Sequence, residues 1–106
     1  MIPEVTVEEL AEELKDGSPL VVLDVREDYE LDHSRLDPHV LIPLGDLPDR
    51  FTELDPAVPV VVICRTGNRS GTATRFLLNQ GFVSVRNLVG GMNEWVEKVD
   101  SSMEKY

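Results

Sequence analysis

The stretch Val60-Val61-Val62-Ile63-Cys64-Arg65-Thr66-Gly67-Asn68-Arg69-Ser70 decides the fold of this chain. Its first four residues form an unbroken β-branched run, which predicts a buried strand. Residues 71–80 predict a helix, so a thiol lies where a strand ends and a helix is about to begin. In α/β folds, ligands bind outside the carboxyl ends of the strands. Cys64 is therefore the leading candidate for a functional residue.

The residues that follow Cys64 are suited to hold an anion. Gly67 can adopt backbone angles that are closed to other residues, and Asn68 tolerates them better than most. The loop can therefore curl and turn several N–H groups inward, next to the positive end of the following helix. Arg65 and Arg69 add full charges. These features predict that the pKa of the Cys64 thiol is lowered.

A packing role is the alternative for Cys64, because free cysteine is among the most buried residue types. A cysteine that only fills space has no need of a basic loop that contains glycine. The two arginines, Gly67 and Asn68 therefore favour a reactive thiol.

The length of 106 residues predicts one domain over residues 1–106, with residues 100–106 as a frayed tail. The sequence has no apolar run long enough to span a membrane, and residues 1–5 do not resemble a signal segment. The one cysteine excludes an internal disulfide and a cysteine-rich zinc site. Because an activated free thiol fits a reducing compartment, we expect the protein in the cytoplasm.

The charge of the chain is uneven. The net charge is −10, yet residues 56–93 contain four arginines (Arg65, Arg69, Arg75 and Arg86) and no Asp or Glu. The acidic remainder argues against a nucleic-acid partner. Two buried strands explain part of the absence of acids from this stretch. The four arginines that remain favour a small anion bound near Cys64.

The other segments alternate between helix and strand. Thr6 and Glu9 have the spacing of a capping box for a helix that ends near residues 16–17. Further strands are predicted at residues 20–23, 40–42 and 82–86, with helices at 27–31, from about 46 to 54, and at 92–99. This alternation predicts an α/β fold with a parallel sheet covered on both faces by helices.

Asp24 and Arg26 follow the second predicted strand and lie at the same sheet end as Cys64 if the strands are parallel. They form either a local ion pair that braces neighbouring loops or part of the border of a pocket. His33 and His39 lie in a polar loop, and two histidines without further ligands make a poor metal site. We therefore interpret them as surface residues and expect no metal.

Three blocks of the chain resemble the rhodanese, or sulfurtransferase, family. Residues 23–27 are similar to its D-V-R-E segment, and residues 64–70 to its C-R-S-G-N-R-S loop. Residues 87–92 with Trp95 resemble its closing L-x-G-G-x-x-x-W block, and residues 42–44 match a weaker block. One departure is that residues 34–39 replace the family's G-H-I-P-G-A segment and lack both glycines.

The resemblance implies a single rhodanese-like domain with a five-stranded parallel sheet. It implies that Cys64 takes sulfane sulfur from a small anionic donor such as thiosulfate and passes it, as a persulfide, to cyanide, a thiol or a protein. Arg65 and Arg69 would bind the anion, and the loop formed by Arg65, Thr66, Gly67, Asn68, Arg69 and Ser70 would hold the outer sulfur. Asp24 and Arg26 would brace the site. No cofactor, nucleic acid or membrane is implied.

Two other readings of the sequence stay open. A Cdc25-like phosphatase or arsenate reductase shares the fold, but such phosphatases have five residues between Cys and Arg, whereas four lie between Cys64 and Arg69. A rhodanese-fold module that binds or senses sulfide or oxidant without turnover is the second alternative. A sulfur relay to a protein shares the transferase chemistry and differs only in the acceptor.

Overall fold

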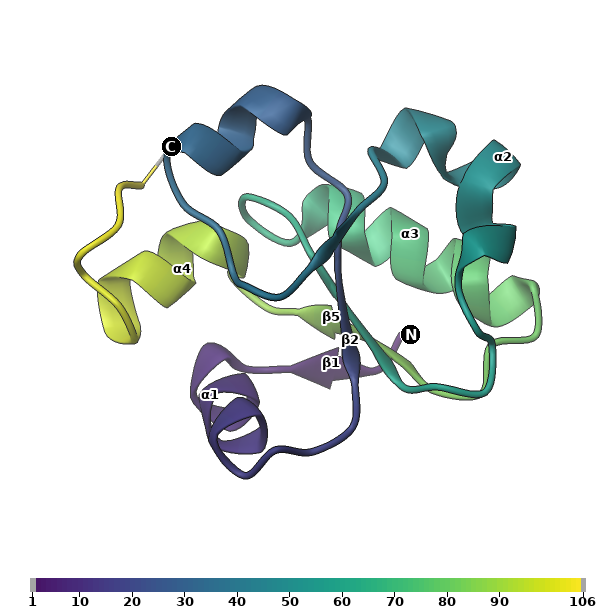
Figure 1. Ribbon diagram of the computed structural model, residues 1–106, viewed down its shortest axis with the longest axis horizontal. Coiled ribbons are helices and arrows are strands. Elements are labelled where there is room, and N and C mark those ends of the chain that lie inside the picture. The colour runs from purple at the N-terminus through teal and green to yellow at the C-terminus, as the bar shows by residue number, and fades with distance from the viewer. Residues whose placement is uncertain (1, 106) are drawn as a thin grey trace.

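The computed structural model describes residues 2–105 and is built around a central sheet (Figure 1). Within these residues, five parallel strands pair in the order β1-β5-β4-β2-β3. The strands are β1 (Glu4–Val5), β2 (Val21–Asp24), β3 (Val40–Leu41), β4 (Val60–Ile63) and β5 (Val85–Leu88). The predicted α/β class and the parallel sheet are confirmed.

Helices cover both faces of the sheet, as expected. The α-helices are α1 (Val7–Lys15), α2 (Leu47–Arg50), α3 (Asn68–Asn79) and α4 (Gly91–Lys98). Short 3-10 helices are η1 (Asp28–Asp32), η2 (Leu44–Asp46) and η3 (Phe51–Glu53). Figure 1 shows α1 and α4 on one side of the sheet and α2 and α3 on the other.

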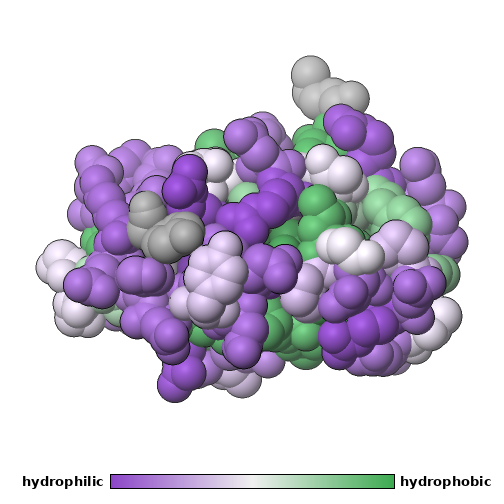
Figure 2. Space-filling view, turned by 90° about the horizontal axis from the view of Figure 1, so that it is seen from above, coloured by the Kyte–Doolittle hydropathy of each residue, from purple (hydrophilic) through white to green (hydrophobic). Residues whose placement is uncertain are grey.

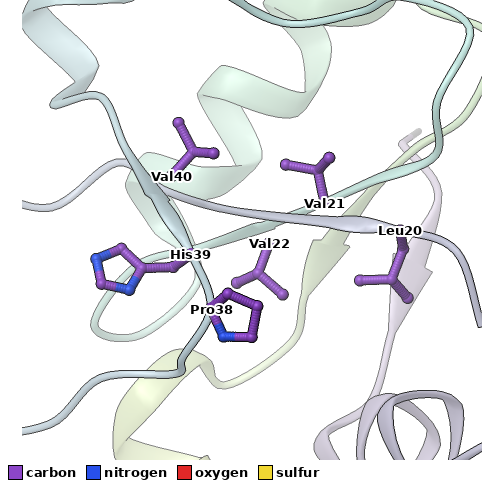
Figure 3. Close-up of a pocket in the computed structure, with 6 residues that line it drawn as sticks. All are labelled: Leu20, Val21, Val22, Pro38, His39 and Val40. Atoms are coloured by element: carbon purple, nitrogen blue, oxygen red, sulfur yellow. The ribbon is translucent and has the colours of Figure 1, made fainter. Parts of the chain in front are cut away.

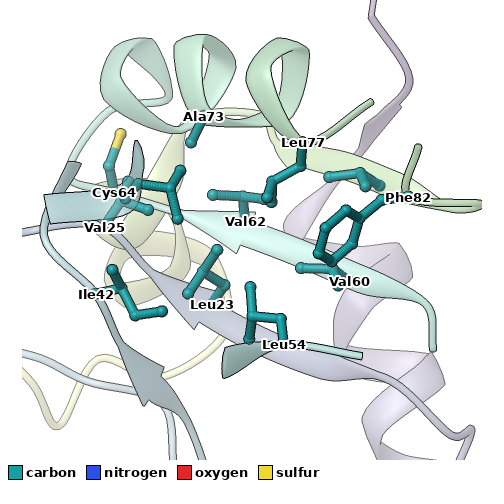
Figure 4. Close-up of a cluster of buried hydrophobic side chains, with 12 residues drawn as sticks. Leu23, Val25, Ile42, Leu54, Val60, Val62, Cys64, Ala73, Leu77 and Phe82 are labelled. Atoms are coloured by element: carbon teal, nitrogen blue, oxygen red, sulfur yellow. The ribbon is translucent and has the colours of Figure 1, made fainter. Parts of the chain in front are cut away.

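The alternation of side chains along β4 explains the two cores. Val60 and Val62 pack with Ala73 and Leu77 of α3 in one cluster, which Figure 4 shows. Val61 and Ile63 face the opposite cluster, which contains Leu10 of α1 and Met92 of α4. Because successive side chains of a strand point to opposite faces, a strand buried on both sides is apolar throughout. The β-branched run at residues 60–63 is such a strand.

The start of α1 matches the predicted capping box. The Thr6 hydroxyl accepts the N–H of Glu9 at 3.1 Å, and the Glu9 carboxylate accepts the N–H of Thr6 at 2.9 Å. The helix ends at Lys15, with Asp16 as its C-cap. These reciprocal bonds satisfy two N–H groups that the first turn would leave without partners.

Several elements differ from the sequence prediction. The helix predicted from about residue 46 to 54 is instead the four-residue α2, flanked by the 3-10 helices η2 and η3. Helix α3 begins at Asn68 rather than Gly71, because Gly67 is its N-cap, with a φ of 109°. Strand β5 is displaced from residues 82–86 to Val85–Leu88, since the Phe82 N–H donates to Leu77 at the end of α3 instead of joining the sheet. Strand β1 is only two residues long, and no local pattern predicted it.

We expected residues 100–106 to be a frayed tail, and Tyr106 lies outside the described residues. Met103 packs beside the second cluster, and its sulfur accepts the N–H of Arg35. The Glu104 N–H donates to the His33 carbonyl at 3.0 Å. The tail, as far as it is described, lies against the segment that follows η1. Among residues 2–105, no helix combines the length and the apolar character that crossing a bilayer requires.

Candidate active site

Cys64 directly follows β4, at the carboxyl end of the sheet. Its side chain is 1% exposed and belongs to the cluster between the sheet and α3. Figure 4 shows it at one end of that cluster, with its sulfur directed toward α3. The structure therefore combines the two sequence readings, because Cys64 is a buried packing residue whose sulfur meets polar groups of the loop.

The loop after Cys64 turns back on its sulfur. Gly67 lies in the left-handed region and donates its N–H to Sγ at 3.1 Å. Ser70, in the first turn of α3, places Oγ 3.2 Å from Sγ. An early start of α3 makes this possible, because the free N–H groups of the first helical turn point toward the sulfur. Residues 68–70 are thus part of the helix as well as of the loop.

The pKa of the Cys64 thiol lies below its ordinary value of 9.0. Burial alone raises this pKa, because it removes water from the thiolate. Hydrogen bonds outweigh that effect, and they come from the Ser70 hydroxyl and from the N–H groups of Ser70, Gly67 and Thr66. The predicted direction is correct, and the inward-turned N–H groups that the sequence predicted are among the main causes. Arg69 also interacts with the charge on Cys64, but its charge is not among the leading causes of the lowered thiol pKa.

Arg69 is engaged by an acid that the sequence reading did not single out. Its Nη1 and Nη2 donate to the two carboxylate oxygens of Glu30 at 2.7 and 2.8 Å. Glu30 is 1% exposed, and its Oε2 also accepts the N–H of Glu27 at 2.8 Å. This carboxylate raises the pKa of Arg69, and the hydrogen bonds from Arg69 lower the pKa of Glu30. Arg69 therefore offers less positive charge to a substrate than an unpaired arginine would.

The remaining loop residues are closer to solvent. Arg65, Thr66 and Asn68 are exposed, and Gly67 is half-buried. Of the other arginines in the acid-free stretch, Arg86 pairs with Glu13 of α1 at 2.7 Å. The stretch is therefore not one cluster of positive charge around Cys64, because the fold brings acids from elsewhere to Arg69 and Arg86.

Asp24 and Arg26 form a fully buried ion pair at the end of β2. Arg26 donates to both carboxylate oxygens of Asp24, at 2.8 to 3.0 Å. It also donates to the Ser34 carbonyl at 2.7 Å, and more weakly to the Glu30 carbonyl at 3.4 Å. Parallel pairing places Asp24 beside Ile63, so the pair lies at the sheet end of Cys64. This geometry matches the bracing interpretation.

Asn87 is a buried polar residue that sequence reasoning placed in a turn. It lies in β5 instead, and its side chain bonds both Ser70 and the Gly67 carbonyl. The only sequence signal for it was its place at the start of the closing glycine block. The predicted strand began three residues and ended two residues too early, and this hid the direction of the Asn87 side chain.

The histidines lie apart from Cys64. His33 pairs with Glu104 at 3.5 Å, and His39 bonds the Leu36 carbonyl at 2.8 Å. Between residues 2 and 105 there is no group of three or more metal-ligating side chains. His39 also lines an apolar hollow with Leu20, Val21, Val22, Pro38 and Val40, at the opposite, amino end of β2 and β3 (Figure 3).

The molecular surface is largely polar. Figure 2 views the molecule from the side that carries η1 and α2, and hydrophilic residues dominate it around a limited apolar band. This distribution is consistent with the excess of acidic residues outside residues 56–93.

Known proteins resemble the chain along almost its whole length. The rhodanese-like domain family profile matches residues 6–98. The putative sulfur carrier protein YrkF of Bacillus subtilis is 36% identical over 93% of this chain, and the match spans 54% of YrkF. The putative sulfurtransferase YtwF of the same organism is 37% identical, covering 89% of this chain and 90% of YtwF.

A solved structure agrees with these matches. The rhodanese-related protein from Thermoplasma volcanium superposes with a TM-score of 0.84 at 31% identity. The match covers 92% of this chain and 93% of that protein. The fold that the sequence resemblance implied is therefore shown by structural comparison as well.

Proposed function

Because the chain belongs to the rhodanese-like domain family, we propose that it is a sulfurtransferase that carries sulfur on Cys64 as a persulfide. The observation that carries this proposal is the position of the one cysteine. Its sulfur is buried where N–H groups of a tight loop and of the first turn of α3 converge. Such a site stabilises an anionic sulfur.

The proposed reaction has two half-reactions. The Cys64 thiolate attacks the outer sulfur of thiosulfate, the S–S bond of the donor breaks, and sulfite leaves with the electron pair. The product is a Cys64 persulfide, whose outer sulfur carries the negative charge. An acceptor nucleophile such as cyanide or a thiol then attacks that sulfur. Thiocyanate or a new persulfide leaves, and the Cys64 thiolate returns.

The loop residues have separate roles in this proposal. The N–H groups of residues 65–70 hold the anionic sulfur, and no general base is needed if the thiolate forms readily. Arg65 and Arg69 attract the oxygens of the donor, with Arg69 sharing its charge with Glu30. Asp24 and Arg26 keep the adjoining segment in place. We assign these residues to the site as a hypothesis for mutagenesis.

A protein acceptor fits the proposal as well as a small one. YrkF is named a putative sulfur carrier protein, and its resemblance to this chain supports a role in passing sulfur onward. The acidic surface outside residues 56–93 would favour a basic docking partner. We further propose that residues 1–106 act as a single domain in a reducing compartment such as the cytoplasm.

Intact mass spectrometry tests the function directly. Wild-type protein is incubated with thiosulfate or a polysulfide, its mass is measured, and cyanide is then added. A gain of one sulfur atom that cyanide removes, and that Cys64→Ser lacks, is the expected result. Circular dichroism should show that Cys64→Ser keeps its fold. No mass gain with either donor would overturn the proposal, and an aryl-phosphate assay would then distinguish a phosphatase from a sensor.

A further inference from the structure

Asn87 bonds Ser70 and Gly67, the two residues whose polar groups contact the Cys64 sulfur. Its side chain is 6% exposed, and it projects from β5, the strand that pairs with β4. It contacts Ser70 on one side and the loop at Gly67 on the other. This residue is therefore placed to act on the thiol through Ser70 without touching substrate.

The orientation of the Asn87 amide follows from its partners. Its Nδ2 donates to the Gly67 carbonyl at 3.2 Å, and a carbonyl can only accept. Oδ1 must therefore face Ser70, and Oδ1 can also only accept. Ser70 consequently donates its hydroxyl hydrogen to Asn87.

This arrangement restricts what Ser70 can do for Cys64. A serine hydroxyl has one hydrogen, and here Asn87 holds it. At 3.2 Å from Sγ, the Ser70 oxygen can then only accept from the thiol S–H. The hydroxyl hydrogen bond that lowers the thiol pKa is therefore available only when this hydrogen turns from Asn87 to the sulfur. When Cys64 loses its proton, sulfur needs a donor in place of an acceptor. Ser70 must either turn its hydrogen to sulfur, which leaves buried Oδ1 without a donor, or present its oxygen to the thiolate.

We propose that Asn87 is a positioning residue that competes with the Cys64 thiolate for the single hydroxyl hydrogen of Ser70. The proton released by Cys64 goes to solvent, and Ser70 keeps its own hydrogen and only reorients, so the S–H bond is the only one that breaks. The N–H groups of Thr66, Gly67 and Ser70 are unaffected by this competition. Asn87 would thus keep the thiolate less stable, and more reactive, than the loop alone would make it.

The charged groups around Cys64 are already in ion pairs that Asn87 does not enter. Arg69 of α3 pairs with Glu30 of η1, and Asp24 at the end of β2 pairs with Arg26. Arg65 lies on the loop itself and is exposed. Substituting Asn87 leaves these charges in place, so a change in thiol ionisation reports on the Ser70 hydrogen.

Two substitutions of similar size separate the acceptor from the rest of the side chain. Asn87→Leu removes the acceptor, whereas Asn87→Asp keeps an acceptor and adds negative charge. Both lose the hydrogen bond to the Gly67 carbonyl, so any loosening of the loop is common to them. Because Cys64 is the only cysteine, thiolate absorbance against pH and iodoacetamide alkylation rates both report on one group.

The midpoint of thiol ionisation should fall by about one pH unit in Asn87→Leu, the size of one hydrogen bond to a charged group. It should rise in Asn87→Asp. In a Ser70→Ala background, Asn87→Leu should have no effect, because there is no hydrogen left to release. The proposal would be overturned if both Asn87 variants moved the midpoint of thiol ionisation in the same direction. It would also be overturned if Asn87→Leu still lowered the midpoint in the Ser70→Ala background.

Ser70→Ala alone gives an independent test if an Asn87 variant fails to fold. With Asn87 holding the hydrogen, removal of the hydroxyl should move the midpoint by well under one pH unit. A rise of about one unit would show that Ser70 already donates to the thiolate, and would contradict the competition. The inference deepens the proposed sulfur transfer, but none of these titrations uses a sulfur donor, so either proposal can fail without the other.

Discussion

Arg69, in the first turn of α3, binds the carboxylate of Glu30 through both terminal nitrogens, although 39 positions separate the two residues. Glu30 is buried, whereas the Arg69 side chain is 35% exposed. The pair ties the Cys64 loop to the segment between β2 and β3. It also divides the charge of Arg69 between a resident carboxylate and any anion that reaches the loop.

Replacing Glu30 by Gln should improve the use of thiosulfate. The substitution keeps an oxygen that Arg69 can bond but removes the negative charge, so Arg69 attracts the donor more strongly. We expect the KM for thiosulfate to fall roughly fivefold, equivalent to about 1 kcal/mol for a partly exposed ion contact. Steady-state formation of thiocyanate measures it. Glu53→Gln, which breaks the exposed Arg50–Glu53 pair, is the matched control and should leave KM unchanged. An unchanged KM in Glu30→Gln would mean that Arg69 does not meet the donor.

Replacing Arg69 by Ala should reduce both stability and activity. It leaves the buried Glu30 carboxylate without its main partner, and because Arg69 is partly exposed we expect a loss of about 2 kcal/mol in the free energy of unfolding. Urea denaturation measures this loss. The double variant Arg69→Ala, Glu30→Gln should recover part of it, since the unpaired charge is gone. Recovery of thiosulfate use in the double variant would contradict a role for Arg69 in donor binding.

Acid should destabilise the wild-type protein partly through Glu30. Hydrogen bonds from Arg69 lower the pKa of Glu30 below 4.5 in the folded state. The resulting stabilisation is fully present above pH 4.5 and is lost as the pH falls through the lowered folded pKa. Unfolding free energies measured at several pH values below 4.5 should therefore decline less steeply in Glu30→Gln. Parallel declines in the two proteins would show that Glu30 contributes nothing to acid sensitivity.

Replacing Gly91 by Ala should disturb the backbone of the Cys64 loop, against which Gly91 packs. Gly91 has a φ of 59°, and an added Cβ would lie 2.5 Å from the carbonyl oxygens of Cys64 and Arg65. Those carbonyls accept the N–H groups of Met92 and Asn93, so the start of α4 is fixed to the loop. We expect a loss of about 3 kcal/mol in the free energy of unfolding and slower sulfur transfer.

Gly17→Ala is the control for that prediction. Gly17 has a φ of 72°, but an added Cβ would meet nothing within 4 Å. It should therefore cost only the backbone strain, about 1 kcal/mol, and leave sulfur transfer intact. Thermal unfolding and thiocyanate formation compare the two variants. Equal costs at both positions would show that the contact with the loop carbonyls is unimportant.

Much of the fold was predictable because local patterns and tertiary packing agree. The runs at residues 20–23 and 60–63 read as buried strands, and β2 and β4 occupy the interior of the sheet. Strand β1 could not be predicted from its two residues, since it is held by pairing with β5, more than 80 positions away. The displacement of β5 has a similar origin, because Phe82 bonds back to Leu77 at the end of α3.

The candidate site was predictable in its residues but less so in its electrostatics. The loop from Cys64 to Ser70 and the pair of Asp24 with Arg26 stand out in the sequence. The partners Glu30 and Asn87 do not, because each reaches the loop only through the fold. A local count of charge therefore overestimates the positive field at Cys64, and it misses the hydrogen bonds that lower the thiol pKa.

The ion pairs around η1 also affect where this domain can change in length. Segments without regular strands or long helices are usually where a fold accepts insertions. Residues 26–34 should not accept insertions, because two contacts hold this segment in place. Arg26 donates to the Ser34 carbonyl, and Glu30 pairs with Arg69 of α3. The turns at Gly17 and Gly81 have open space around them. Extra residues, or a fused domain, would be accommodated there rather than in the irregular chain beside the thiol.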